Sequence, residues 1–212
     1  MKGPEPPSLT AHRQTEHSDY DNYQEKDELR EALVDEQRFL CCYCMKRISP
    51  VATDMKIEHW QSQHGHETEQ LNYQNLLGAC MGGQGQPPDL QHCDTLKGER
   101  DLRFNPADRN HHIETRISYD LEGVIHSNDA AFDQELNDVL NLNLKVFQNN
   151  RKSVLDVVLD WWREEKRRLR GPIPRAEIER QIELRAGGAG ALQPYYRIAV
   201  WWLEQKLGGM AA

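Results

Sequence analysis

Apolar residues recur at helical spacing near the start of the chain and again throughout its last third. In residues 21–40, Leu29 and Leu33 fall on one face and the positions between them are mostly charged. This pattern predicts a helix that ends at Cys41. Residues 1–20 carry prolines and polar side chains without a period, which predicts an extended N-terminal arm.

The last third of the chain predicts a series of helices separated by glycine- and proline-rich breaks. Residues 130–169 have a helical period, and residues 171–174 break it before a charged helix over residues 175–185. Residues 187–190 form a second break, and residues 194–207 predict a final amphipathic helix. The apolar stripe of the first helix is predicted to include Leu155, Val158 or Leu159, and Trp162.

Two tryptophan pairs, Trp161-Trp162 and Trp201-Trp202, lie on these late helices. We expect one ring of each pair to face the core. The other ring is either exposed at a protein interface, where tryptophan is enriched, or buried in a fully intramolecular helical core. Residues 129–212 are therefore predicted to be a helical C-terminal region that docks a partner.

Between these helical parts the pattern changes over short distances. A strand over residues 55–57 is predicted to end on Glu58 and His59, and the glycine-rich residues 82–88 predict a loop. Alternation followed by a turn predicts a hairpin over residues 113–125. The remaining predictions are a polar loop over residues 61–70, a short helix over residues 73–80, and a helix over residues 93–103 with Asp94 near its N-terminal cap.

Composition narrows the class of protein. The chain has 212 residues, enough for one domain or for a small domain with extensions, and no run of about 18 apolar residues that would span a membrane. Residues 1–7 lack the apolar core of a signal peptide, so we expect a cytoplasmic protein. The formal net charge of −8 argues against a free-standing, non-specific nucleic-acid binder, because such binding depends on lysine and arginine.

Five cysteines in a cytoplasmic chain favour metal binding over disulfides. The predicted ligands of a structural zinc ion are four of them: Cys41, Cys44, Cys80 and Cys93. The first pair has the spacing of a zinc knuckle, but twelve residues separate the second pair. The alternative is that Cys80 is a buried apolar residue and that His92 or Cys42 is the fourth ligand.

Glu58 and His59 lie between the two cysteine elements and indicate metal-assisted cleavage of a phosphodiester. Such hydrolysis needs a base that activates water and a divalent ion that neutralises developing charge. We expect His59 to be the base and Glu58 to bind the ion, with Asp94 as a second oxygen ligand. Oxygen ligands favour Mg²⁺ or Mn²⁺. Asn75 is predicted either to hold His59 in place or to cap a helix or turn.

The helix after Cys93 carries Lys97, which is either a phosphate contact or plain helix surface. Longer segments of this region resemble a known family. They are residues 37–44 (QRFLCCYC), 57–60 (IEHW), 73–77 (YQNLL), 93–98 (CDTLKG), 119–125 (YDLEGVI), and 140–143 (LNLN) followed by Arg151. Together they resemble the HNH endonucleases, and more closely the PtuB-like HNH subunits of Septu antiphage systems, over roughly residues 25–155.

The resemblance implies an α+β fold: a zinc-stabilised ββα-metal finger within a mostly helical chain. It implies a nuclease domain over residues 21–128, with His59 as general base, Glu58 and Asp94 as metal ligands, and Asn75 as the supporting residue. Many HNH proteins carry aspartate where Glu58 stands, and asparagine or histidine where Asp94 stands.

The family also implies partners. These are an ABC- or SMC-type ATPase subunit (PtuA-like), a DNA substrate and, in some systems, a retron reverse transcriptase with its RNA–DNA product. The hypothesis is therefore a metal-dependent DNA endonuclease that acts as the effector subunit of an antiphage complex. Two alternatives stay open: a non-catalytic, zinc-stabilised adaptor, and an RNA-cutting toxin.

Overall fold

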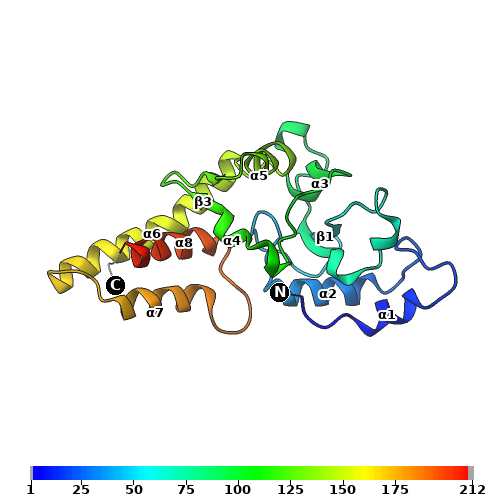
Figure 1. Ribbon diagram of the computed structural model, residues 1–212, viewed down its shortest axis with the longest axis horizontal. Helices are drawn as coiled ribbons and strands as arrows, with labels where there is room; N and C mark the ends of the chain where they lie inside the picture. The colour runs from blue at the N-terminus through cyan, green and yellow to red at the C-terminus, as the bar shows by residue number, and fades with distance from the viewer. Residues whose placement is uncertain (1, 210–212) are drawn as a thin grey trace.

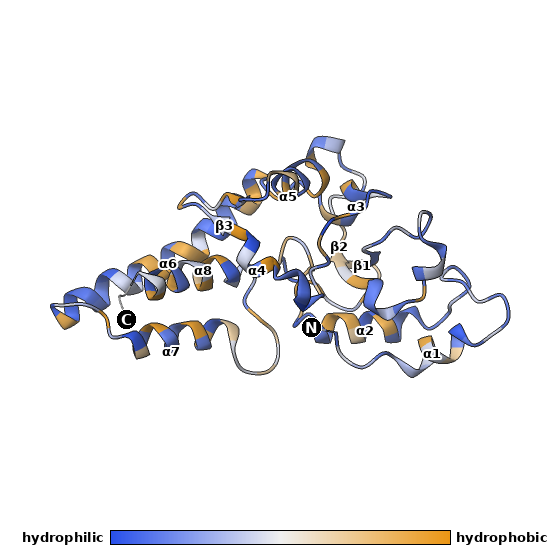
Figure 2. Ribbon diagram, in the orientation of Figure 1, coloured by the Kyte–Doolittle hydropathy of each residue, from blue (hydrophilic) through white to orange (hydrophobic). Residues whose placement is uncertain are grey.

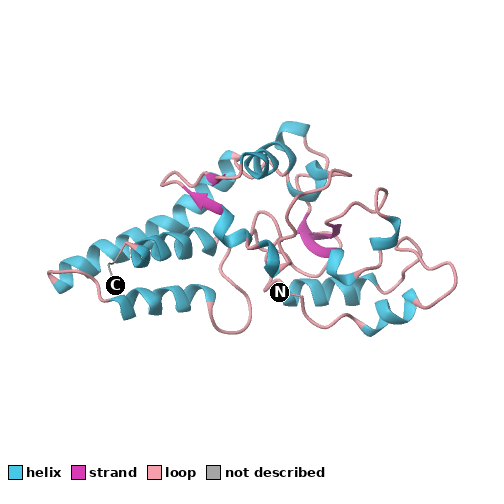
Figure 3. Cartoon of the chain, in the orientation of Figure 1, coloured by secondary structure: helices cyan, strands magenta, loops and turns pink. Residues whose placement is uncertain are grey.

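A computed structural model describes residues 2–209, and Figure 1 shows them as two regions side by side. One region holds the N-terminal helices and a small sheet, and the other is an elongated group of late helices. The fold is α+β, with short strands between many helices (Figure 3). The helices are α1 (Pro7–Arg13), α2 (Lys26–Glu36), α3 (Cys93–Lys97), α4 (Ile113–Arg116), α5 (Ala130–Gln134), α6 (Lys145–Leu169), α7 (Arg175–Ala186) and α8 (Tyr196–Gly208).

The strands form two antiparallel pairs, β1 (Met55–His59) with β2 (Leu76–Cys80), and β3 (Ile117–Tyr119) with β4 (Ile125–Ser127). The second pair confirms a hairpin in this region, but residues 113–116, predicted as part of its first strand, form α4 instead. Short 3-10 turns lie at Glu67–Glu69, Tyr73–Asn75, Pro88–Leu90 and Arg109–His111, and one π-helical turn lies at Glu135–Val139. Within residues 2–209, no helix is both long and apolar enough to cross a membrane.

The N-terminal segment is not the extended arm that its composition predicts. It contains α1, and Leu9 of this helix is fully buried in a small core with Tyr23 and Leu29. The helix predicted to reach Cys41 is also shorter, because α2 ends at Glu36. The residues that follow turn the chain through positive φ angles, 53° at Arg38 and 65° at Phe39, and so deliver the first cysteines.

Residues 73–80, predicted as a short helix, instead form a 3-10 turn and then β2. Every residue of β2 is buried, so this strand shows no alternation of apolar and polar positions. Its backbone bonds β1 on one side and the Gln37 side chain on the other. The Gln37 amide donates to Gly78 O at 2.8 Å and accepts from Gly78 N at 2.6 Å. The apolar run therefore belongs to a strand that is covered on all sides.

The helix predicted over residues 130–169 is interrupted between α5 and α6. Two asparagine side chains hold this connection in a non-helical path. The Asn143 amide bonds both Ile125 N and Ile125 O at 2.9 Å, and Asn141, at φ 49°, donates to Gln91 O at 2.9 Å. Hydrogen bonds from side chains to the backbone compete with helix formation, and here they keep residues 141–143 out of a helix.

In the late helices, α8 lies between α6 and α7 (Figure 1). The apolar stripe of α6 buries Leu155 and Val158, as its period predicts, and Figure 2 shows apolar residues along all three helices. The rings of Trp162 and Trp202 meet edge-on with centroids 5.1 Å apart, and Trp202 is buried. Both tryptophan pairs thus make contacts within the chain, and Trp161, Trp162 and Trp201 are half-buried.

Candidate functional site

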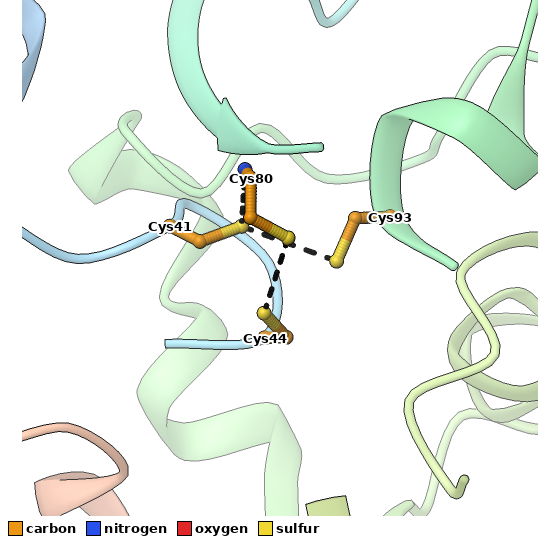
Figure 4. Close-up of side chains that lie close together, drawn as sticks. All are labelled: Cys41, Cys44, Cys80 and Cys93. Carbon is orange, nitrogen blue, oxygen red and sulfur yellow. Dashed lines mark hydrogen bonds between the residues drawn. The ribbon is translucent and has the colours of Figure 1, made fainter. Parts of the chain in front are cut away.

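Four cysteine side chains meet where three elements of the N-terminal region come together (Figure 4). Cys41 and Cys44 lie in the turn after α2, Cys80 ends β2, and Cys93 begins α3. Their four sulfur atoms lie within 4.8 Å of one another, with 3.9 Å from Cys41 Sγ to Cys93 Sγ and 3.7 Å from Cys44 Sγ to Cys80 Sγ. A tetrahedral zinc ion with Zn–S bonds of about 2.3 Å requires sulfur atoms about 3.8 Å apart. The cluster therefore fits a structural zinc ion.

The alternative ligands lie outside this tetrahedron. The Cys42 sulfur is not part of the group, and His92 Nδ1 lies 3.2 Å from Cys93 Sγ, within reach of a sulfur that is already a candidate ligand. The long separation between Cys80 and Cys93 is closed by a loop that folds back, where His92 N donates to Gly82 O at 3.0 Å. Gly82 has φ 58°, and a Cβ there would lie 2.4 Å from His92 O. Glycine is thus required for this return.

Beside the zinc cluster, Glu58 lies in a buried polar group and is only 2% exposed. Its Oε1 accepts from the Tyr43 hydroxyl at 2.7 Å and lies 3.0 Å from Lys97 Nζ. Asp94 lies close enough to shift the pKa of this carboxyl group. Asp94 comes from α3, so the strand pair and the helix together bring the two carboxyl groups near each other, with Lys97 and Lys56 as their ammonium partners.

The two carboxyl groups have pKa values that are shifted in opposite directions. Burial raises the pKa of Glu58 well above its usual range, and the neighbouring Asp94 carboxyl raises it further. Burial acts the same way on Asp94, but the hydrogen bond from Glu58 and the Lys56 ammonium bring the pKa of Asp94 below its usual value. Glu58 is thus the weaker acid of the two carboxyl groups.

Lys97 does not occupy the position that a phosphate contact requires. Its side chain is 1% exposed, and its ammonium donates to His59 O at 2.9 Å in addition to pairing with Glu58. The accessible cation beside the carboxyl pair is Lys56, whose Nζ lies 3.1 Å from Asp94 Oδ2 and whose side chain is 28% exposed. Period-two alternation along β1 places Lys56 and Glu58 on one face, and this signal identifies the residue that sequence reasoning missed.

His59 points away from Glu58, as alternation along β1 predicts, and its side chain is buried, with an exposed fraction of 8%. Its Nε2 lies 3.0 Å from Gln70 O. A carbonyl oxygen only accepts, so Nε2 carries the proton and Nδ1 is left as the acceptor nitrogen. Burial lowers the pKa of His59, and the ring is therefore neutral near pH 7. A neutral imidazole with a free acceptor is able to take a proton from water.

Asn75 is buried and organises the loop between β1 and β2. Its Oδ1 accepts from Gln61 N at 2.8 Å, and its Nδ2 donates to Gln61 O at 3.0 Å and to Glu69 O at 3.1 Å. The amide thus ties the two ends of the loop together. Because Gln70 follows directly and holds His59, Asn75 supports the histidine through the loop, without touching its ring.

Two comparisons with known proteins find no match for the sequence. No protein-family model matches the sequence, and no curated protein matches it. Any function assigned to the chain therefore depends on the geometry of Glu58, Asp94, His59 and the cysteine cluster.

Proposed function

We propose that the chain is a metal-dependent endonuclease of the HNH type, which hydrolyses phosphodiester bonds in DNA. The observation that carries this proposal is that Asp94 lies beside the buried carboxyl of Glu58, whose strand, β1, also carries a neutral His59. A structural zinc does not need these oxygen ligands. The order of β1, β2 and α3 and the four-cysteine cluster support the same assignment.

The carboxyl pair fits a hard divalent ion. The two carboxyl groups lie near each other and each pairs with a lysine ammonium, so a divalent cation would also be attracted there. Mg²⁺ and Mn²⁺ prefer such oxygen ligands, and Mg²⁺ commonly keeps several waters, so Glu58 and Asp94 suffice as protein ligands. When bound, the ion would neutralise the charge that develops on the phosphate.

In this proposal His59 Nδ1 takes a proton from the attacking water. Nε2 keeps its proton and donates it in a hydrogen bond to Gln70 O, which fixes the tautomer and stabilises the imidazolium that forms. Asn75 keeps the loop that presents Gln70 in place. Lys56, on the accessible side of Asp94, is the side chain positioned to meet the substrate phosphate.

We further propose that the nuclease is the effector subunit of an antiphage complex with an ABC- or SMC-type ATPase. The support is the sequence resemblance over residues 25–155, together with the formal net charge of −8. An acidic chain gains little from phosphate contacts of its own, and a basic partner surface would bring DNA to it. A retron reverse transcriptase with its RNA–DNA product is a further proposed partner.

The test is cleavage by the chain co-purified with its genomic neighbour, with Mg²⁺, Mn²⁺ or EDTA, on plasmid, single-stranded DNA and tRNA. His59→Ala is expected to lose about 10²- to 10⁴-fold in rate, the usual contribution of a general base. His64→Ala is the matched control, because His64 is exposed in the neighbouring loop. Native cleavage by His59→Ala refutes the mechanism, and cleavage of tRNA alone favours the RNA-cutting toxin.

One observation favours a second candidate, a zinc-stabilised adaptor without catalysis. Lys97 and Lys56 already pair with Glu58 and Asp94, so the carboxyl groups have cationic partners without a divalent ion. For an adaptor, zinc would survive EDTA dialysis and no substrate would be cleaved in the presence of Mg²⁺ or Mn²⁺ and the partner. Divalent-dependent cleavage that His59→Ala abolishes excludes it.

A further inference from the structure

The N-terminal segment lies on the candidate base. We propose that Tyr20 is a positioning residue that holds the His59 imidazole in its working orientation, an inference that rests on the proposed nuclease function. The rings of Tyr20 and His59 lie with centroids 4.5 Å apart and planes at 90°, the edge-to-face arrangement that aromatic pairs prefer. This contact joins a segment that resembles a loose arm to the centre of the site.

Tyr20 and His59 are linked a second time through Gln70. The backbone carbonyl of Gln70 accepts from His59 Nε2 at 3.0 Å, and its side-chain oxygen accepts from Tyr20 N at 3.1 Å. One residue thus holds the base by its main chain and the tyrosine by its side chain. The Lys26 ammonium lies 4.7 Å from the centroid of the Tyr20 ring and restrains that ring further.

The segment that carries Tyr20 is itself anchored, so the contact is not that of a free terminus. Ser8 Oγ and the Tyr23 hydroxyl hydrogen-bond at 2.7 Å, and His12 Nε2 lies 2.9 Å from Asp19 O. Further upstream, Gly3 N donates to the Glu36 carboxylate on α2 at 2.7 Å. Figure 1 shows α1 near the start of α2, joined to it by a long loop. Anchors on both sides leave Tyr20 little freedom to leave His59.

The orientation of His59 matters because its two nitrogens have different tasks. The bond from Nε2 to Gln70 O leaves Nδ1 as the acceptor, and among the described residues 2–209 no hydrogen bond is made by Nδ1. Rotation of the ring would break the Gln70 bond and turn the acceptor away from the water. One hydrogen bond fixes one point of the ring, and the perpendicular Tyr20 ring fixes its plane. Together they define a single orientation.

The kinetic test uses two substitutions at one position in the full chain with its partner. Tyr20→Leu removes the ring and keeps the backbone bond to Gln70, and it is expected to lower kcat by about 3- to 10-fold, the range that one aromatic pair supplies. KM should stay within about twofold, because a positioning residue acts on the chemical step. Tyr20→Phe keeps the ring and should restore kcat. Asp21→Ala, the exposed neighbour, is the matched control.

A spectroscopic measurement tests the contact apart from nuclease activity. Long-range proton–nitrogen NMR spectra should show His59 as a single tautomer protonated at Nε2 in the native chain and in Tyr20→Phe, and as an averaged mixture in Tyr20→Leu. Nuclear Overhauser contacts between the two rings are expected in the native chain, and their absence overturns the proposal without any variant.

The outcomes separate the two proposals. A Tyr20→Leu protein with native kcat and an unaveraged His59 tautomer overturns the positioning role, even if the chain is a nuclease. A His59→Ala protein that still cuts overturns the nuclease mechanism, whereas the spectra still decide whether Tyr20 holds the ring. Loss of kcat in Tyr20→Phe equal to that in Tyr20→Leu also counts against the proposal, because the hydroxyl and not the ring would then matter.

Discussion

The ion pair between Lys97 and Glu58 offers the sharpest quantitative prediction. Their side chains are 1% and 2% exposed, and 3.0 Å separates Lys97 Nζ from Glu58 Oε1. Lys97→Met keeps the aliphatic stem and removes only the ammonium. The substitution therefore isolates a buried charge in the centre of the candidate site.

The expected cost follows from what the ammonium leaves behind. His59 O loses its donor, and a buried acceptor without a partner costs about 1–3 kcal/mol. Glu58 loses its nearest cation, and breaking a buried pair by removing one partner costs about 3–5 kcal/mol in all. We expect the free energy of unfolding of Lys97→Met to fall by this larger amount. Glu58→Gln should recover at least about 2 kcal/mol of it in the double variant, because the stranded carboxyl is gone.

The assay is urea unfolding followed by tryptophan fluorescence at pH 7 and saturating zinc, for the native chain, both single variants and the double variant. Lys56→Met is the matched control, since the Lys56–Asp94 pair is partly exposed at 3.1 Å and is worth about 0–1 kcal/mol. Two results would contradict the buried ion pair. One is that Lys97→Met lowers the free energy of unfolding no more than Lys56→Met does. The other is that the losses in Lys97→Met and Glu58→Gln simply add in the double variant.

Four further changes test other parts of the structure. Cys93→Ser should abolish binding of one zinc per chain, as measured by metal analysis, because the sulfur tetrahedron loses a corner. Gly123→Ala should cost about 2–4 kcal/mol in urea unfolding, because φ is 82° and a Cβ there would lie 2.3 Å from Gln148 O. Asn75→Ala should cost about 2–4 kcal/mol and raise hydrogen exchange in residues 61–70, since three buried hydrogen bonds are lost. Arg38→Ala should speed exchange in residues 187–192 and leave α2 unchanged, because its guanidinium donates to three carbonyls of the connection between α7 and α8.

The local sequence pattern predicts much of the fold. The apolar face of α2, the stripe of α6 and the breaks around α7 are visible along the chain, because each depends on residues within one or two turns. The strand that ends on Glu58 and His59 and the hairpin of β3 and β4 are visible for the same reason. The four zinc-ligand candidates could be recognised because few structures other than a metal site explain so many cysteines in one short region. The structure places their sulfur atoms together.

Local pattern failed where a side chain from elsewhere supplied the deciding bond. The sequence of β2 is an apolar run that fits a helix or a strand, and hydrogen bonds from Gln37 to its open edge favour the strand. The break before α6 depends on the hydrogen bonds between Asn143 and Ile125. Propensity is a small free-energy term, and a pair of buried hydrogen bonds outweighs it.

The sequence by itself determined which chemical groups this protein has: five thiols, a carboxylate next to a histidine, and a second carboxylate at the start of α3. Only the tertiary structure decided what surrounds them. It buries Lys97 against Glu58 and exposes Lys56 beside Asp94, and it lays the ring of Tyr20 on His59. Burial and orientation depend on contacts between distant segments, and these contacts set the charge of each group and the direction in which it acts.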